Sequence, residues 1–296
     1  MELSKVAIPA LPNSGPYQRV AAIDCGSNAI RAGIADVGPH GVDVIERIRR
    51  PIRLGADVFR SGSVGPELET RLIRAFRVFA QRFDELGVSR RIAVATSAMR
   101  NADNGVRICD ELERATGLRL HTISGDQEAS LVRQAVLSKS TRPPDVIADL
   151  GGGSLEVQVL SGSHRIGGAV LPVGTVRLGV MGAITPDQAR ALRQRVLSEL
   201  STIHVPRHCS RLSLCGGNAK ALAKLHPGIR DAGQRTLDLA RLRTELPQVC
   251  ALSVTQRMRS YGLELDRAEV IGAAAVIFDA VGEWLGVGRA TVPGVG

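Results

Sequence analysis

The chain has 296 residues and a mass of 31.4 kDa, which indicates two domains at about 100 to 200 residues each. Hydrophobic residues make up 44% and charged residues 23%, which excludes a disordered or fibrous protein. No apolar run reaches the roughly 20 residues that cross a bilayer, so we expect no membrane partner. The net charge is +9, and 34 of the 38 basic residues are arginine. This excess favours either an anionic partner or a bias in coding composition.

Nucleic acid is the obvious polyanion, but aromatic residues make up only 3% of the chain. Because proteins that bind single strands stack bases on aromatic rings, we expect no nucleic-acid partner. The five cysteines are odd in number and include no Cys-x-x-Cys pair, which favours a reducing cytoplasm over a disulfide framework. A weak candidate for a metal site is the group His204, His208, Cys209 and Cys215. The spacing of these residues matches no standard zinc pattern.

The first half of the chain begins with a tail, residues 1–18, whose prolines interrupt any signal-peptide core. Three strands follow, then helices and strands alternate. In the helix over 66–86, apolar residues recur every three or four positions and predict one buried stripe. We predict strands at 19–24, 29–37, 42–50, 92–95 and 119–123, and helices at 66–86, 105–116 and from 124.

A polar segment, Ser138–Pro144, contains Pro143-Pro144 and is interpreted as a linker and a hinge. The expected domains are therefore 19–140 and 141–296. In the second half we predict strands at 146–149, 155–160, 164–171 and 211–215, helices at 186–203 and 217–225, and a mostly helical remainder. The last helix, 268–285, is apolar enough to be either core or the interface of a homodimer, and core is favoured.

The two halves repeat one pattern, because Ala22–Ser27 and Ala148–Ser154 each read as a strand entering an Asp-x-Gly turn with a hydroxyl residue. This indicates a duplicated domain. Glycines let backbone amides approach an anion, and Asp24 and Asp149 at the strand ends are candidate ligands for hydrated Mg²⁺. Ordinary hairpins capped by aspartate are the structural alternative. The pair of turns favours phosphate binding.

Ordered segments along the chain resemble the Ppx/GppA phosphatase family, the exopolyphosphatases and guanosine pentaphosphate phosphohydrolases. The resemblance extends from about Arg19 to the end. The segments are Ala22–Arg31, Ala95–Arg100, Ile123–Ala129, Asp149–Glu156, Leu171–Leu178, Gly216–Ala219 and Arg267–Ala274.

The resemblance implies an α/β fold of two ribonuclease H-like domains, as in the actin-like ATPase superfamily, with an inter-domain cleft. It implies Mg²⁺-dependent release of terminal phosphate from inorganic polyphosphate or from guanosine penta- or tetraphosphate. By position, Glu128 would be the general base, and Asp24, Asp149 and Glu156 would hold the metal. The phosphate-binding residues would be Gly26, Ser27, Asn28, Arg31, Arg100, Gly151, Gly152, Gly153, Ser154, Gly217, Asn218 and Arg267.

The chemistry of phosphoryl transfer fits these residue types, because it needs positioned donors, charge neutralisation and a carboxylate that activates water. Each assignment has a structural alternative. Glu128 could serve the helix dipole, Asn218 could cap a helix, Arg100 could be a surface charge, and Arg267 could merely begin the last helix.

The sequence departs from the family pattern at Gln127, where an acidic residue is common, and at Leu155, where a hydroxyl residue is common. Both departures favour weaker activity, and the second removes a potential phosphate donor. Cys25 within Asp-x-Gly would be sensitive to oxidation if exposed. The chain also ends at Gly296, before a short helix with which family members usually continue. Truncation there, the oligomeric state and the preferred substrate stay open. So do two other functions, a non-catalytic polyphosphate or alarmone binder and an ATPase or kinase of the same superfamily.

Overall fold

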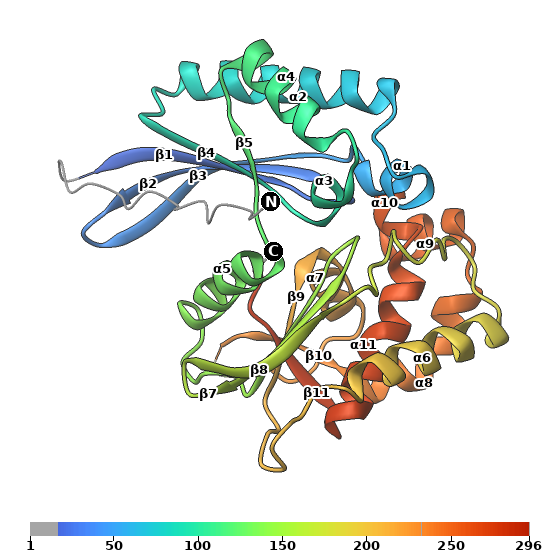
Figure 1. Cartoon of the computed structure of the whole chain (residues 1–296). Helices are drawn as coiled ribbons and strands as arrows, with labels where there is room; N and C mark the ends of the chain where they lie inside the picture. Colours follow the sequence, from blue (N-terminus) through green and yellow to red (C-terminus); the bar gives the residue numbers. More distant parts are fainter. Residues whose placement is uncertain (1–16, 232, 296) are drawn as a thin grey trace. The chain divides into compact units, whose positions relative to one another are not determined.

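The protein forms two compact units, divided between Ser124 and Gly125. A computed structural model describes residues 17–231 and 233–295 (Figure 1). The predicted tail lies outside the described residues up to position 16. The division falls earlier than the boundary at 140/141 that Pro143-Pro144 suggested. The reason is that the helix after Ser124 packs on the second sheet, where the Gln158 side-chain amide donates to the Ala129 carbonyl at 2.9 Å.

The first unit contains a five-stranded sheet in the order β3-β2-β1-β4-β5. The first three strands are antiparallel, and β4 and β5 run parallel to β1. The strands are β1 (Gln18–Cys25), β2 (Ile30–Gly38), β3 (Gly41–Arg50), β4 (Arg90–Ala95) and β5 (Leu120–Thr122). The helices are α1 (Leu54–Ser61), α2 (Pro66–Glu85), α3 (Ser97–Asn101) and α4 (Gly105–Thr116).

The core of the first unit lies between the sheet and helices α2 and α4, which Figure 1 shows along one face of it. The apolar stripe predicted for α2 is confirmed, since Leu72, Phe76, Phe79 and Phe83 are buried in this core. Phe76 and Phe79 meet edge to face, with ring centroids 5.9 Å apart, a geometry that aromatic quadrupoles favour.

The second unit contains a six-stranded sheet in the order β10-β11-β9-β6-β7-β8. Its strands are β6 (Val146–Leu150), β7 (Leu155–Ser161), β8 (His164–Leu171), β9 (Leu212–Cys215), β10 (Arg235–Asp238) and β11 (Arg289–Val292). Its helices are α5 (Gly125–Leu137), α6 (Pro186–Leu200), α7 (Gly216–Leu225), α8 (Leu239–Ala251), α9 (Val254–Tyr261), α10 (Leu265–Ala268) and α11 (Ile271–Leu285).

The two sheets share one topology, which confirms the duplication. In each, three antiparallel strands are joined by parallel strands beside the first of the three, β4 and β5 in one unit and β9 and β11 in the other. Helix α5 covers one face of the second sheet, while α6, α7, α8 and α11 pack on the opposite face. Helix α11 is core as expected, because every residue from Ile271 to Gly282 is buried.

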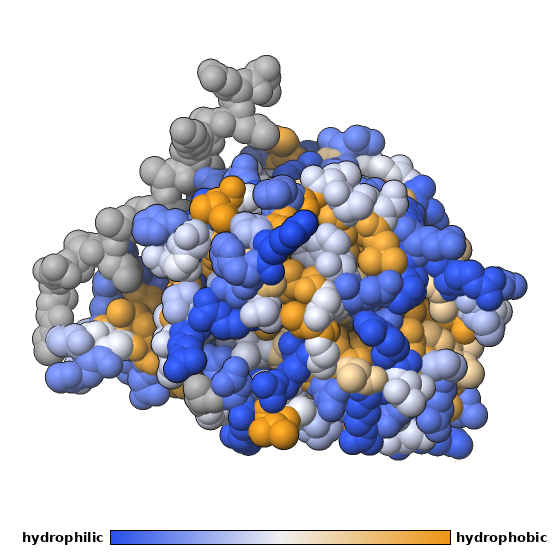
Figure 2. All heavy atoms as spheres, turned by 90° about the horizontal axis from the view of Figure 1, so that it is seen from below, coloured by the Kyte–Doolittle hydropathy of each residue, from blue (hydrophilic) through white to orange (hydrophobic). Residues whose placement is uncertain are grey.

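Four short elements were not predicted, namely α1, α3, β10 and β11. The strands β10 and β11 have four residues each, too few for an alternating pattern to stand out. They pair with each other across more than 50 residues, since Asp238 lies opposite Arg289. No helix among residues 17–231 and 233–295 combines the length and the apolarity that a bilayer span requires. Figure 2 shows one face of the molecule, where hydrophilic residues dominate and hydrophobic ones form small scattered patches.

Among the described residues, the interior of the second unit holds a fully buried arginine, Arg257, for which no ion pair with a carboxylate is found. Arg257 is 0% exposed and donates to three carbonyl oxygens, those of Val249 at 3.3 Å, Cys250 at 3.1 Å and Ala268 at 2.9 Å. Burial lowers the pKa of this guanidinium. The guanidinium nevertheless stays protonated, and its N–H groups satisfy the carboxyl ends of two helices, α8 and α10.

We expect Arg257→Met to lower the free energy of unfolding by about 3 kcal/mol, because three buried carbonyls lose their donor. Urea unfolding would measure the change. The matched control is Arg259→Met, which removes an exposed arginine from the same helix and should change stability by less than about 0.5 kcal/mol. Equal stability of the two variants would contradict this role for Arg257.

Candidate active site

The first candidate phosphate-binding loop follows Asp24 and Cys25, the last two residues of β1, and contains Gly26, Ser27 and Asn28. The Gly26 amide donates to the Ala29 carbonyl at 3.2 Å and closes the turn. The start of α1 binds the outer side of this turn, since the Gly55 amide donates to the Ser27 carbonyl at 2.9 Å. In a trans peptide the carbonyl and the next amide point in opposite directions. The Asn28 amide therefore points away from α1, as an anion-binding turn requires.

The predicted charged residues of the first unit gather at the carboxyl ends of β1 and β4. Arg31 lies opposite Asp24 in the β1–β2 ladder, and its Nη1 is 3.3 Å from Asp24 Oδ2. Loss of hydration raises the pKa of Asp24, and the charge and hydrogen bond of Arg31 only partly counteract this. Arg100 lies on α3 directly after β4, and its Nη1 donates to the Ile123 carbonyl at 2.6 Å.

Arg53 was not predicted as part of this site. It has left-handed backbone angles, φ 61° and ψ 44°, at the start of α1, which costs a side chain of this size roughly 1 kcal/mol or more. Its amide donates to the Asn28 carbonyl at 3.2 Å, so the unusual conformation helps to hold the turn. No sequence pattern predicts left-handed backbone angles at an arginine. The only local signal is Pro51, which directly follows the end of β3.

The second candidate phosphate-binding loop follows Asp149 and Leu150, the last two residues of β6, and contains Gly151, Gly152, Gly153 and Ser154. Its carbonyls are held by the segment after β8, numbered 172–178. Amides 175, 176 and 177 donate to the carbonyls of Gly151 and Gly152 at 2.8–3.2 Å, and a side-chain nitrogen of residue 177 donates to the Gly153 carbonyl at 2.7 Å. By the same trans-peptide geometry, amides 152, 153 and 154 point away from this segment.

Gly174 makes this support possible. A Cβ at this position would lie 2.2 Å from the Gly153 carbonyl carbon and 2.4 Å from the Gly152 carbonyl oxygen, closer than real side-chain atoms come to backbone. Only a glycine lets the two segments approach in this way. Sequence reasoning placed Gly174 and Arg177 in a family-like segment but gave neither a function, although Arg177 binds the Gly153 carbonyl through Nε.

The carboxylates Asp149 and Glu156 lie on one face of the second sheet. They are directly opposite each other in the β6–β7 ladder, and residues paired in this way share a face. Glu156 is 2% exposed and accepts a hydrogen bond from the Ser154 hydroxyl. The same face continues through Gln158 and Leu160 of β7, where α5 covers it.

Helix α5 brings Glu128 toward this pair. Val132 and Val136 pack on the face with Leu160, and Glu128 precedes Val132 by four residues, so all three lie on the same side of the helix. The helix runs along β7, because Ala129 binds Gln158 and Gly125 is next to Val170, the ladder partner of Glu156. Glu128 therefore lies at the end of the sheet face that carries Asp149 and Glu156.

Gly217, Asn218 and Arg267 form a third group in the second unit. Helix α7 begins directly after β9, whose last residue pairs with Asp149. Arg267 Nη1 donates to the buried Asn218 Oδ1 at 2.6 Å. A Cβ on Gly217 would lie 2.3 Å from Arg267 Nη2, so the guanidinium covers the first turn of α7. Arg267 is thus held at the N-terminus of α7.

The second unit thus brings together Glu128, Asp149, the loop 151–154, Glu156 and the Arg267 group, while Asp24, the loop 26–28, Arg31 and Arg100 belong to the first unit.

A family model described as the Ppx/GppA phosphatase family matches residues 33–293. Exopolyphosphatase 2 of Mycobacterium tuberculosis is 30% identical over 285 residues, which cover 88% of this chain and 89% of that protein. The chain belongs to the Ppx/GppA phosphatase family.

Solved structures agree with the family assignment. The crystal structure of the Ppx/GppA family member of Aquifex aeolicus matches with a TM-score of 0.78 at 25% identity, covering 95% of both chains. An exopolyphosphatase from Cytophaga hutchinsonii shares the fold, with a TM-score of 0.81 at 20% identity over 93% of both chains. The expected α/β fold of two units, each built on its own sheet, is therefore confirmed. The protein is a phosphoanhydride hydrolase of the exopolyphosphatase-like kind.

Two of the departures from the family pattern, Leu155 and Cys25, lie in the core. Leu155 is fully buried in the main core of the second unit, and it points away from the face that carries Glu156 because strand side chains alternate. Cys25 is also fully buried, and burial raises the pKa of its thiol well above the ordinary value. The thiol therefore stays protonated and unreactive, and the concern about oxidation of the first loop does not apply.

Proposed function

We propose that this Ppx/GppA phosphatase releases terminal orthophosphate from inorganic polyphosphate or guanosine pentaphosphate, with Glu128 as general base and Mg²⁺ as cofactor. The observation that carries this proposal is the position of Glu128. It lies on the inner side of α5, at the end of the sheet face that holds Asp149 and Glu156. A glutamate that served only the helix dipole would have no need to face the sheet.

In the proposed reaction, a water oxygen attacks the terminal phosphorus and the bond to the bridging oxygen breaks. Glu128 orients the water and takes its proton, and the bridging oxygen leaves with the shortened chain. Amides of the loops 26–28 and 151–154 bind phosphate oxygens, as backbone turns of this kind do. Arg31, Arg100 and Arg267 neutralise charge on the phosphate chain, a role that suits guanidinium groups.

The carboxylates present fit Mg²⁺. Among the residues that the structure describes, no group of three or more His, Cys, Asp or Glu side chains could hold a metal ion. Mg²⁺, however, is usually bound by one or two carboxylates together with water and substrate phosphates. Asp149 and Glu156, paired across β6 and β7, offer such a set, with Asp24 as a further candidate from the first unit. When bound, the ion would neutralise phosphate charge.

The choice of substrate rests on charge and on the relatives. Arginine supplies 34 of the 38 basic residues, which suits a long phosphate chain better than a single nucleotide. The relative from Mycobacterium tuberculosis is named an exopolyphosphatase. We therefore propose polyphosphate as the preferred substrate.

Orthophosphate release from long-chain polyphosphate and from guanosine pentaphosphate, each with Mg²⁺ and with excess chelator, tests the proposal. We expect metal-dependent release from both, with a higher kcat/KM for polyphosphate. A higher value for the pentaphosphate would reverse the substrate preference. Tight binding of both compounds without any release would instead indicate a non-catalytic binder, and release that survives the chelator would exclude the metal.

A further inference from the structure

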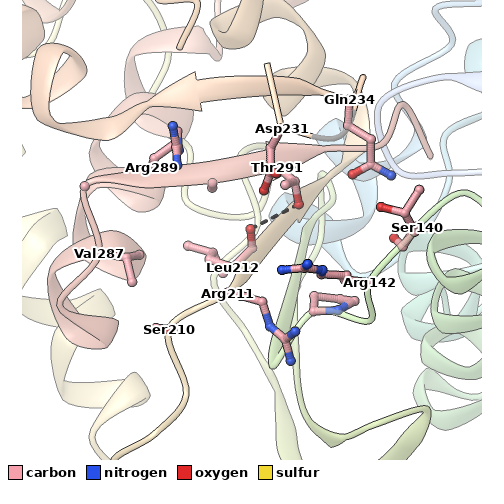
Figure 3. A pocket seen from close by; sticks show the side chains of 14 residues that line it. Ser140, Arg142, Ser210, Arg211, Leu212, Asp231, Gln234, Val287, Arg289 and Thr291 are labelled. Atoms are coloured by element: carbon pink, nitrogen blue, oxygen red, sulfur yellow. Dashed lines mark hydrogen bonds between the residues drawn. The ribbon is translucent and has the colours of Figure 1, made fainter. Parts of the chain in front are cut away.

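A polar cavity of about 560 Å³ lies in the second unit at the amino-terminal ends of β6, β9 and β11, three strands that run parallel (Figure 3). The phosphate loop and Asp149 lie at the carboxyl end of β6. The length of that strand separates the two places by roughly 13 Å at 3.3 Å per residue. The cavity is therefore a site of its own.

One end of the cavity is cationic. Arg142 lines it and, within residues 17–231 and 233–295, takes part in no hydrogen bond or ion pair. Arg211 lies next to it in Figure 3 and is held by Asp145, whose Oδ1 accepts from its Nη2 at 2.6 Å and its Nε at 3.2 Å. The second oxygen of Asp145 accepts the amides of Ser210 and Arg211, each at 2.9 Å.

This arrangement holds the Arg211 guanidinium in place and leaves the Arg142 guanidinium available to a ligand. Burial opposes ionisation of Asp145, but the hydrogen bonds from Arg211 and the two amides lower the pKa of its carboxyl overall, so the carboxylate stays charged. It holds Arg211 at a defined position beside the unpaired Arg142. Two adjacent guanidinium groups form a suitable binding site for a phosphate group.

The other side of the cavity offers groups that bind hydroxyls. Asp231 lies across from the arginines beside Thr291, and Gln234 and Ser140 complete this wall (Figure 3). Gln234 is fixed because its Nε2 donates to the Lys139 carbonyl at 2.5 Å. None of the lining residues is aromatic, so there is no platform on which a base could stack. The Asp231 carboxylate repels an inorganic phosphate chain but accepts hydrogen bonds from hydroxyl groups.

We propose that this cavity binds a small phosphorylated polyol, such as a sugar phosphate, with its phosphate at Arg142 and Arg211 and its hydroxyls at Asp231 and Gln234. The site is independent of the proposed hydrolysis.

Titration calorimetry of the whole chain with ribose 5-phosphate, without divalent metal, tests the proposal. We expect binding that weakens at least tenfold in Arg142→Ala, because a charge-assisted contact is lost, and that is unchanged in Arg195→Ala, which removes an exposed arginine of α6. Hydrogen exchange should show protection of 139–144 and 287–291 on binding. Equal affinity in the two variants, or protection elsewhere only, would overturn the proposal.

Asp231→Asn separates the proposed ligand from an inorganic one. Loss of the carboxylate should weaken ribose 5-phosphate and strengthen inorganic tripolyphosphate, because one ligand donates to Asp231 and the other is repelled by it. Tighter binding of both ligands in this variant would show a general anion site and would overturn the assignment to a polyol phosphate.

Discussion

Replacing Glu128 with glutamine is expected to lower kcat for orthophosphate release by about a hundredfold or more, the range for loss of a general base. Glutamine keeps the size of the side chain and can still hold a water molecule, but it cannot take the proton. KM should change little, because the loops and arginines that we propose to bind phosphate are intact. Steady-state rates with polyphosphate and Mg²⁺ would measure both constants.

The control for this substitution is Asp126→Asn in the same first turn of α5. Asp126 is 80% exposed and pairs with Arg165 at 2.8 Å, so this change removes an equal charge from the helix N-terminus without affecting the inner side of the helix. Activity should stay within about threefold of wild type. If both variants lose activity equally, helix charge and not proton transfer explains the effect, and the base must lie elsewhere.

The second large effect is expected for Gly174→Ala. The new methyl group would overlap the backbone of Gly152 and Gly153, which cannot rotate aside as a side chain would. The loop 151–154 must move, and a shift of about 1 Å at a positioned site can reduce kcat/KM by about a hundredfold. The strain should also lower the free energy of unfolding by about 1–3 kcal/mol.

Phosphate release and thermal unfolding of Gly174→Ala would be measured beside Gly167→Ala. A Cβ at Gly167 would lie 3.8 Å from the Val159 Cβ, an ordinary contact, so this variant should resemble wild type. Wild-type kcat/KM in Gly174→Ala would mean that the loop is not held in place by the segment after β8.

Most of the fold could be predicted because its longer elements follow strong patterns. The stripe of α2 and the repeated Asp-x-Gly turns were sufficient for the helix and the duplication. The boundary between the units was not predictable, because Pro143-Pro144 is a better linker by composition than Ser124-Gly125. What assigns α5 to the second unit is a tertiary contact, the hydrogen bond from Gln158 to Ala129.

The candidate site was predictable where a motif carries it and not where packing creates it. Glu128, Asp149 and Glu156 are predicted by the family pattern, and the structure explains how α5 and the β6–β7 ladder bring them to one face. The left-handed Arg53 and the tight approach of Gly174 have no signature in the sequence, because each depends on backbone segments that are distant along the chain. The assigned roles of the site residues stay predictions until the variants are measured.

The repeated topology allows the charges at equivalent positions of the two units to be compared, and they differ. Asp24 pairs with Arg31 across β1 and β2, and Asp149 pairs with Glu156 at the equivalent rungs of β6 and β7. Equivalent positions of the two ladders thus carry a cation in the first unit and an anion in the second. Under the proposed assignments, this difference in charge sign suits the first unit to bind phosphate and the second to bind a positive ion.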